Sequence, residues 1–101
     1  MNAGRPNPRP ATPSYQLKQV LQITGVSRET LVAYCEHGIL PLTPDDVERA
    51  TFNDELVCAI RRTTFLRQRH GINLAGLRLI NELLTEVERL RRELRFARDA
   101  G

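Results

Sequence analysis

Three glycines constrain the fold of this 101-residue chain more than any other feature. Gly25, Gly38 and Gly71 each follow a run of residues with helical periodicity. Glycine adopts a left-handed backbone conformation at little cost, so a glycine directly after such a run indicates a helix end. The glycines predict three short helices, and about 100 residues suffice for one domain with a modest core.

The first two of these helices are predicted to form a helix-turn-helix. Val20, Leu21 and Ile23 supply one face of the first helix, and Ser27 stands where an N-cap is needed for the second. Two short helices joined by a tight turn that contains glycine are typical of this motif. The buried face of the second helix is expected at Leu31, Tyr34 and Cys35.

A small β-hairpin wing is predicted to follow. Residues 39–41 are apolar, residues 43–50 are polar with a Pro-Asp-Asp turn signal, and residues 51–52 return to an extended pattern. Asn53 is then a suitable N-cap for a third helix, with Asp54 and Glu55 placing negative charge in its first turn. The apolar stripe of this helix comprises Leu56, Ala59, Ile60, Thr63 and Leu66.

A long amphipathic helix is expected from Asn73 to about Arg98. Its apolar positions repeat as in a coiled coil for nearly three heptads. Two interpretations remain open: Ile80 and Leu83 pack on their own domain while the rest frays, or two chains form a homodimer. Glu86 and Glu93 fall at g positions opposite arginines at e positions, which suits a parallel pair. The predicted dimer seam comprises Ile80, Leu83, Val87, Leu90 and Leu94.

Together these patterns predict a mainly all-α fold, a winged helix-turn-helix with a small hairpin and a long C-terminal helix. Residues 1–14 hold four of the six prolines and are expected to be a disordered tail. Residues 15–72 are expected to form the winged domain, and residues 73–101 the long helix with its coiled-coil seam. A pure dimerisation module is one function that this organisation allows.

Composition excludes several function classes. The net charge is only +3, weaker than a dedicated DNA-binding domain usually carries. No stretch is long and apolar enough for a bilayer, no secretory signal is evident, and the two separated cysteines suit a reducing compartment, so a cytoplasmic location is expected. No phosphate loop or catalytic motif occurs, and the positions of His37 and His70 suit helix ends. We expect no enzyme activity, metal, cofactor or small-molecule substrate.

The chain resembles a MerR-type winged-helix domain over residues 15–80. The residues that match the start of such a domain are residues 15–20, residues 24–27, Thr30 with Leu31, Tyr34, and residues 38–40. The resemblance implies DNA binding, yet the chain departs from the family where DNA would be touched. Val32 and Ala33 stand where an arginine and an aromatic residue are typical, and Ala50 stands where a phosphate-binding arginine belongs. Each lost phosphate contact removes one counterion-release contribution to DNA affinity.

Several segments resemble the CbpM-like chaperone modulators: residues 36–41, 44–46, 52–54, the helix with Arg61 and Arg62, residues 73–76, and residues 83–87 leading into a helix rich in Glu and Arg. That resemblance implies binding to the J-domain of a DnaJ-like co-chaperone, CbpA, and inhibition of its stimulation of the Hsp70 chaperone. Residues 71–76 also resemble the DNA-binding repressor HspR, so a MerR- or HspR-type DNA-binding regulator is the alternative. Under the alternative, Arg28 and Arg49 are the candidate DNA contacts.

As the resemblance implies, a J-domain acts through a basic helix, so its binder needs acidic and apolar groups. Some candidate acids have another explanation, because Asp54 and Glu55 suit a helix start and Glu86 suits coiled-coil pairing. The candidate partner-binding residues are Asp45, Asp46, Glu48, Asp54, Glu55, Glu82 and Glu86.

Overall fold

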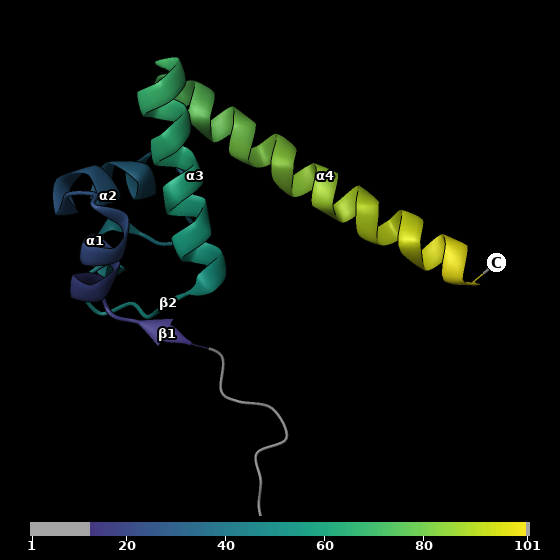
Figure 1. Cartoon of the computed structure of the whole chain (residues 1–101), viewed down its shortest axis with the longest axis horizontal. Coiled ribbons are helices and arrows are strands. Elements are labelled where there is room, and N and C mark those ends of the chain that lie inside the picture. Colours follow the sequence, from purple (N-terminus) through teal and green to yellow (C-terminus); the bar gives the residue numbers. More distant parts are fainter. Residues whose placement is uncertain (1–12, 101) are drawn as a thin grey trace, which may run out of the picture.

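The computed structural model describes residues 13–100, so residues 1–12 of the predicted tail and residue 101 lie outside the description. The helices at residues 17–24, 28–36 and 54–70 gather into one body, and the helix at residues 74–100 projects away from it (Figure 1). The elements are β1 (Ser14–Tyr15), α1 (Leu17–Thr24), α2 (Arg28–Glu36), the 3₁₀ helix η1 (Pro44–Asp46), β2 (Phe52–Asn53), α3 (Asp54–His70) and α4 (Leu74–Ala100). The expected fold class is confirmed.

The helix-turn-helix forms where the glycine and cap signals predict it. Gly25 ends α1 with a φ of 72°, and its N–H donates to the Leu21 carbonyl. Ser27 begins α2, and its Oγ accepts a hydrogen bond of 3.1 Å from the Thr30 N–H. Gly38 follows the end of α2, also with a φ of 72°. These local contacts fix the turn between the two helices, because they satisfy backbone groups that a helix end leaves open.

The strand pair differs from the predicted hairpin in one respect. β2 pairs in antiparallel register with β1, placing Tyr15 opposite Phe52, and residues 39–41 form turns and bends instead of a strand. Ile39 and Leu40 are nevertheless only 2% and 3% exposed, so both side chains belong to the core although they are not in a strand. The Ile39 N–H donates to the carbonyl of Tyr34, a bond that folds the chain back onto α2.

The third helix begins and ends as expected. Asn53 Oδ1 accepts a hydrogen bond of 2.9 Å from the Leu56 N–H, and Gly71 closes the helix with a φ of 65°. The predicted stripe is confirmed in part: Ile60 and Thr63 are buried, and the rest of the stripe is half-buried. Val57, which the sequence reading left out, is buried as well.

The core lies where α1, α2, α3 and β2 meet. Its largest fully buried side chains are those of Tyr34, Phe52, Leu31, Ile39, Ile60, Val20 and Val47. Burying a side chain of this size contributes about 1.5–3 kcal/mol each before the entropy of ordering is subtracted. The body of the molecule is therefore held by apolar contacts within a single chain.

α4 joins this body only through its first turns. Leu77 is 2% exposed, and the Asn81 Nδ2 donates a hydrogen bond of 3.0 Å to the Ile39 carbonyl. Beyond this anchor the helix continues without interruption to Ala100, at an angle to α3 (Figure 1). Among residues 13–100, no helix combines the length and apolar character that crossing a bilayer requires.

Candidate functional site

The surface formed by α2 and residues 43–51, here named the winged face, carries the two arginines that the sequence singled out as DNA contacts. Arg28 is paired with a carboxylate, and Arg49 lies near one. The Arg28 guanidinium makes a salt bridge and a hydrogen bond with Glu48, 20 residues further along the chain. Arg49 lies 3.9 Å from an oxygen of Asp46. A cation already paired with a carboxylate offers less attraction to a phosphate, since the pair is nearly neutral at a distance. This face is therefore close to charge balance.

The positions at which the MerR-type resemblance implies DNA-binding residues hold short apolar side chains that are half-buried. Val32 and Ala50 are half-buried, and both pack against the core cluster. Ala33 is half-buried on the same helix as Val32. Neither valine nor alanine donates a hydrogen bond or carries charge, so these positions contribute packing and no phosphate contact.

A hollow of about 500 Å³ lies between α1 and the segment that leads into β2. Lys18 and Arg49 line it together with Glu48, so its charges are mixed. The remaining lining residues are Gln16, Leu17, Leu21, Ala50 and Thr51. This hollow borders the winged face and shares its near-balance of charge.

A second concave surface, here named the α3–α4 groove, opens where the two long helices diverge. Its volume is about 530 Å³. Among residues 13–100, three carboxylates, Asp54, Glu55 and Glu88, line it, whereas Arg62 is the one basic side chain in its lining. The other lining residues are Ile39, Pro41, Asn53, Leu56, Cys58, Ala59, Asn81 and Thr85. The groove thus combines acidic walls with apolar positions.

Two of the seven acidic candidates, Asp54 and Glu55, lie in this groove, and Asp54 accepts a hydrogen bond of 3.0 Å from the Tyr15 hydroxyl. That bond to the carboxylate raises the pKa of Tyr15 above its ordinary value of 10.0, because the neutral phenol is the hydrogen-bond donor. Asp46 accepts a hydrogen bond of 2.8 Å from the Thr43 hydroxyl in the loop around η1, where Asp45 is also exposed, and neither of these acids lines the groove.

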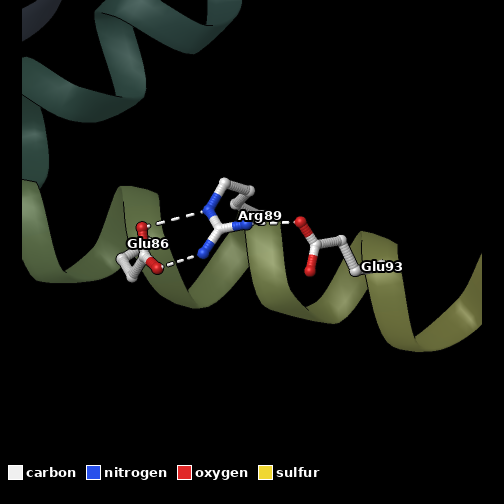
Figure 2. A network of polar contacts seen from close by, with 3 residues as sticks. All are labelled: Glu86, Arg89 and Glu93. Carbon is white, nitrogen blue, oxygen red and sulfur yellow. Dashed lines mark hydrogen bonds and ion pairs between the residues drawn. The ribbon is translucent and has the colours of Figure 1, made fainter.

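The two candidate acids of α4 are engaged within their own helix. Glu82 accepts a hydrogen bond of 3.2 Å from Arg78 one turn earlier. Figure 2 shows the guanidinium of Arg89 between Glu86 and Glu93, along one side of the helix. The hydrogen bond from Arg89 holds the pKa of Glu86 below its ordinary value of 4.5. These carboxylates are less available to a partner than those of the groove.

The predicted dimer seam is exposed along most of its length. Leu83, Val87, Leu90 and Leu94 are 56%, 41%, 49% and 61% exposed, whereas Ile80 is half-buried against the body. A continuous apolar stripe of this kind on a projecting helix is typical of an association surface. Phe96, which the sequence reading did not single out, is 76% exposed on the opposite side of α4.

Glu88 is the groove residue that the sequence reading missed. Leu77, Asn81, Leu84 and Glu88 step by four, three and four, so they share one face of α4. This face adjoins the body, and it is distinct from the seam because adjacent helical residues point about 100° apart. A search for a second periodic face on the long helix would have found it.

The titratable groups that often support catalysis or metal binding are dispersed. Burial raises the pKa of the Cys35 thiol, which is 5% exposed, whereas Cys58 is exposed in the groove. The His37 ring nitrogen Nδ1 lies 3.0 Å from the Ala33 carbonyl within its own helix end. Within residues 13–100, no three His, Cys, Asp or Glu side chains are grouped in a way that suits a metal ion.

The fold and its exposed surfaces define a winged helix-turn-helix protein, and the comparisons with known proteins agree. A family model described as "MerR HTH family regulatory protein" matches residues 15–98. The chaperone modulatory protein CbpM of Pseudomonas entomophila (strain L48) is 30% identical over 77 residues, which is 76% of this chain and 76% of the relative. The chain therefore belongs to the CbpM-like, MerR-type family. Both descriptions are of regulatory proteins rather than enzymes.

Proposed function

We propose that the chain is a non-enzymatic, cytoplasmic chaperone modulator that binds the J-domain of a CbpA-type co-chaperone. Bound in this way, it would prevent the co-chaperone from stimulating Hsp70. The observation that carries the proposal is the small net charge of the winged face in a member of the CbpM-like family. Arg28 is paired with Glu48, Arg49 lies near Asp46, and Ala50 packs against the core. Such a face is poorly suited to a polyanion.

We further propose that the active form is a homodimer held by α4. The exposed stripe from Leu83 to Leu94 supports this, because most of the stability of an amphipathic helix comes from packing its apolar face. A parallel pair would set Glu86 of one chain near Arg91 of the other. The alternative function, DNA-binding regulation, is favoured by one observation only, the helix-turn-helix that the family model matches.

Two binding measurements distinguish these functions. In a calorimetric titration with the isolated J-domain of a CbpA-type co-chaperone, we expect saturable binding with one J-domain per chain. In a mobility-shift assay with duplex DNA at an ionic strength of about 0.15 M, where the Debye length is about 8 Å, we expect no site-selective complex. Site-selective DNA binding that weakens with Arg28→Ala or Arg49→Ala, together with no J-domain binding, would contradict the proposal.

A further inference from the structure

The α3–α4 groove has the shape and the charge of a docking site for a helix. We infer that it binds a cationic amphipathic helix of the partner protein. This inference rests on the proposed function and deepens it by assigning the contact to one surface. It departs from the residues expected from the sequence in two ways: it adds Glu88, and it leaves out the acids of the η1 loop and Glu82 and Glu86.

The groove is preorganised by a contact that fixes one helix against the other. Asn81 on α4 donates to the Ile39 carbonyl at 3.0 Å, while its Oδ1 accepts from Arg62 on α3 at 3.3 Å. The two helices are thus joined at the inner end of the groove by one side chain. A surface that is already ordered before binding loses less conformational entropy on binding.

The charge of the groove is unbalanced in favour of acid. Arg62 is directed to the Asn81 amide, so it does not neutralise a carboxylate. Within residues 13–100, no salt bridge joins Glu55 or Glu88 to a cation, whereas Glu48, Asp46, Glu82 and Glu86 each have an arginine partner. The groove therefore presents carboxylates that remain available for lysine or arginine of a partner.

Apolar groups between the carboxylates provide the other half of the recognition. Leu56 and Ala59 are half-buried on α3, and Pro41 is exposed at the groove edge. An amphipathic helix that lies in a groove places apolar side chains against such positions, with charged side chains directed to the rim. A polyanion is disfavoured by the carboxylates, and a neutral peptide would leave them unpaired.

The groove stays accessible when α4 dimerises. On α4 the groove is lined by Asn81, Thr85 and Glu88, and the seam residue Val87 points about 100° away from Glu88. A coiled coil on the seam therefore leaves the face that lines the groove uncovered. The dimer would carry two grooves, in agreement with one partner helix per chain.

Cys58 provides a direct probe of the groove in the unmodified protein. It lines the groove and is exposed, whereas Cys35 is buried and its pKa is raised, so alkylation at neutral pH reports on Cys58. With a saturating J-domain of the CbpA type, we expect the rate of N-ethylmaleimide labelling at Cys58 to fall at least about tenfold, as in a shielded interface core. In the control, Glu82→Cys in a Cys58→Ser background stays reactive. Undiminished labelling of Cys58 in the saturated complex would overturn the inference.

A matched pair of charge reversals on α4 gives the second test. Glu88→Arg and Glu82→Arg make the same exchange on exposed faces of one helix, inside and outside the groove. We expect Glu88→Arg to raise the Kd at least about tenfold, corresponding to 1.4 kcal/mol, and Glu82→Arg to change it less than about twofold. Circular dichroism verifies that both variants are folded.

The binding measurements distinguish the assignment of the groove from the proposed function. Equal Kd values for both variants, with unchanged wild-type binding, would overturn the groove assignment and leave the proposed function standing. No binding of any J-domain by the wild-type chain would overturn both.

Discussion

The body of the molecule and the distal part of α4 are built from similar apolar residues that end in opposite environments. In the body, Tyr34 and Phe52 are completely buried. In the helix, every residue from 85 to 100 is exposed, including Val87, Leu90 and Leu94 of the seam. Within residues 13–100, the chain buries the apolar side chains of the body but leaves those of the distal seam exposed. The exposure of the seam is the reason that we propose a partner for this helix.

The largest expected effect lies in the body. Phe52→Ala removes a fully buried aromatic side chain from the strand that pairs with Tyr15, and should lower the free energy of unfolding by about 3–5 kcal/mol. Urea denaturation followed by circular dichroism measures this. Phe65→Ala is the control, since Phe65 is 52% exposed and the change should stay within about 0.5 kcal/mol. Equal losses for the two variants would refute the assigned core.

The next largest effect tests the distal helix. Leu90→Lys places a charge in the proposed seam, so self-association should weaken at least about tenfold in sedimentation velocity, a change of 1.4 kcal/mol. Phe96→Lys makes the same kind of exchange on the opposite side of α4 and should leave the dimer intact. If both variants remain dimeric, the seam is not the contact. If the wild-type chain is a monomer at high concentration, the proposed dimer is wrong.

A smaller effect sharpens the description of the body. Tyr34→Phe deletes the hydroxyl that lies 2.8 Å from Thr64 Oγ1, a contact that joins α2 to α3. One hydrogen bond of this kind contributes about 0.5–1.5 kcal/mol to stability. The free energy of unfolding should therefore fall by that amount, while the packing around Phe52 is retained. Thermal denaturation detects it, and a more stable variant would contradict the structural role of the contact.

The smallest effect concerns acid in the distal helix. The hydrogen bond from Arg89 lowers the pKa of Glu86 below its ordinary value of 4.5, so this pair stabilises α4 at pH values above 4.5. The contribution to stability is lost as the pH falls from 4.5 through the lowered pKa. The helical ellipticity should therefore decrease slightly on acidification below that pH, and less so in Glu86→Gln. An identical acid response in both proteins would show that the network in Figure 2 does not stabilise α4.

Sequence patterns predict those features whose partners lie close along the chain. Ser27, Asn53 and the glycines end or begin helices through contacts within four residues, so the helix order was predictable. The strand partner was not, since Tyr15 pairs with Phe52 from the other end of the domain. For the same reason the sequence did not reveal that Glu48 neutralises Arg28. The groove was missed because it depends on the angle between α3 and α4, which Asn81 fixes through a residue 42 positions earlier.

We propose above all that a helix-turn-helix body with little net charge binds a co-chaperone. The most direct measurement is steady-state ATP turnover by Hsp70, stimulated by a CbpA-type co-chaperone, as purified chain is added with and without duplex DNA. The account predicts that turnover falls to the unstimulated rate once the chain exceeds the co-chaperone, and that DNA does not alter the curve. Stimulation that persists at saturating chain, or inhibition that DNA relieves, would contradict it.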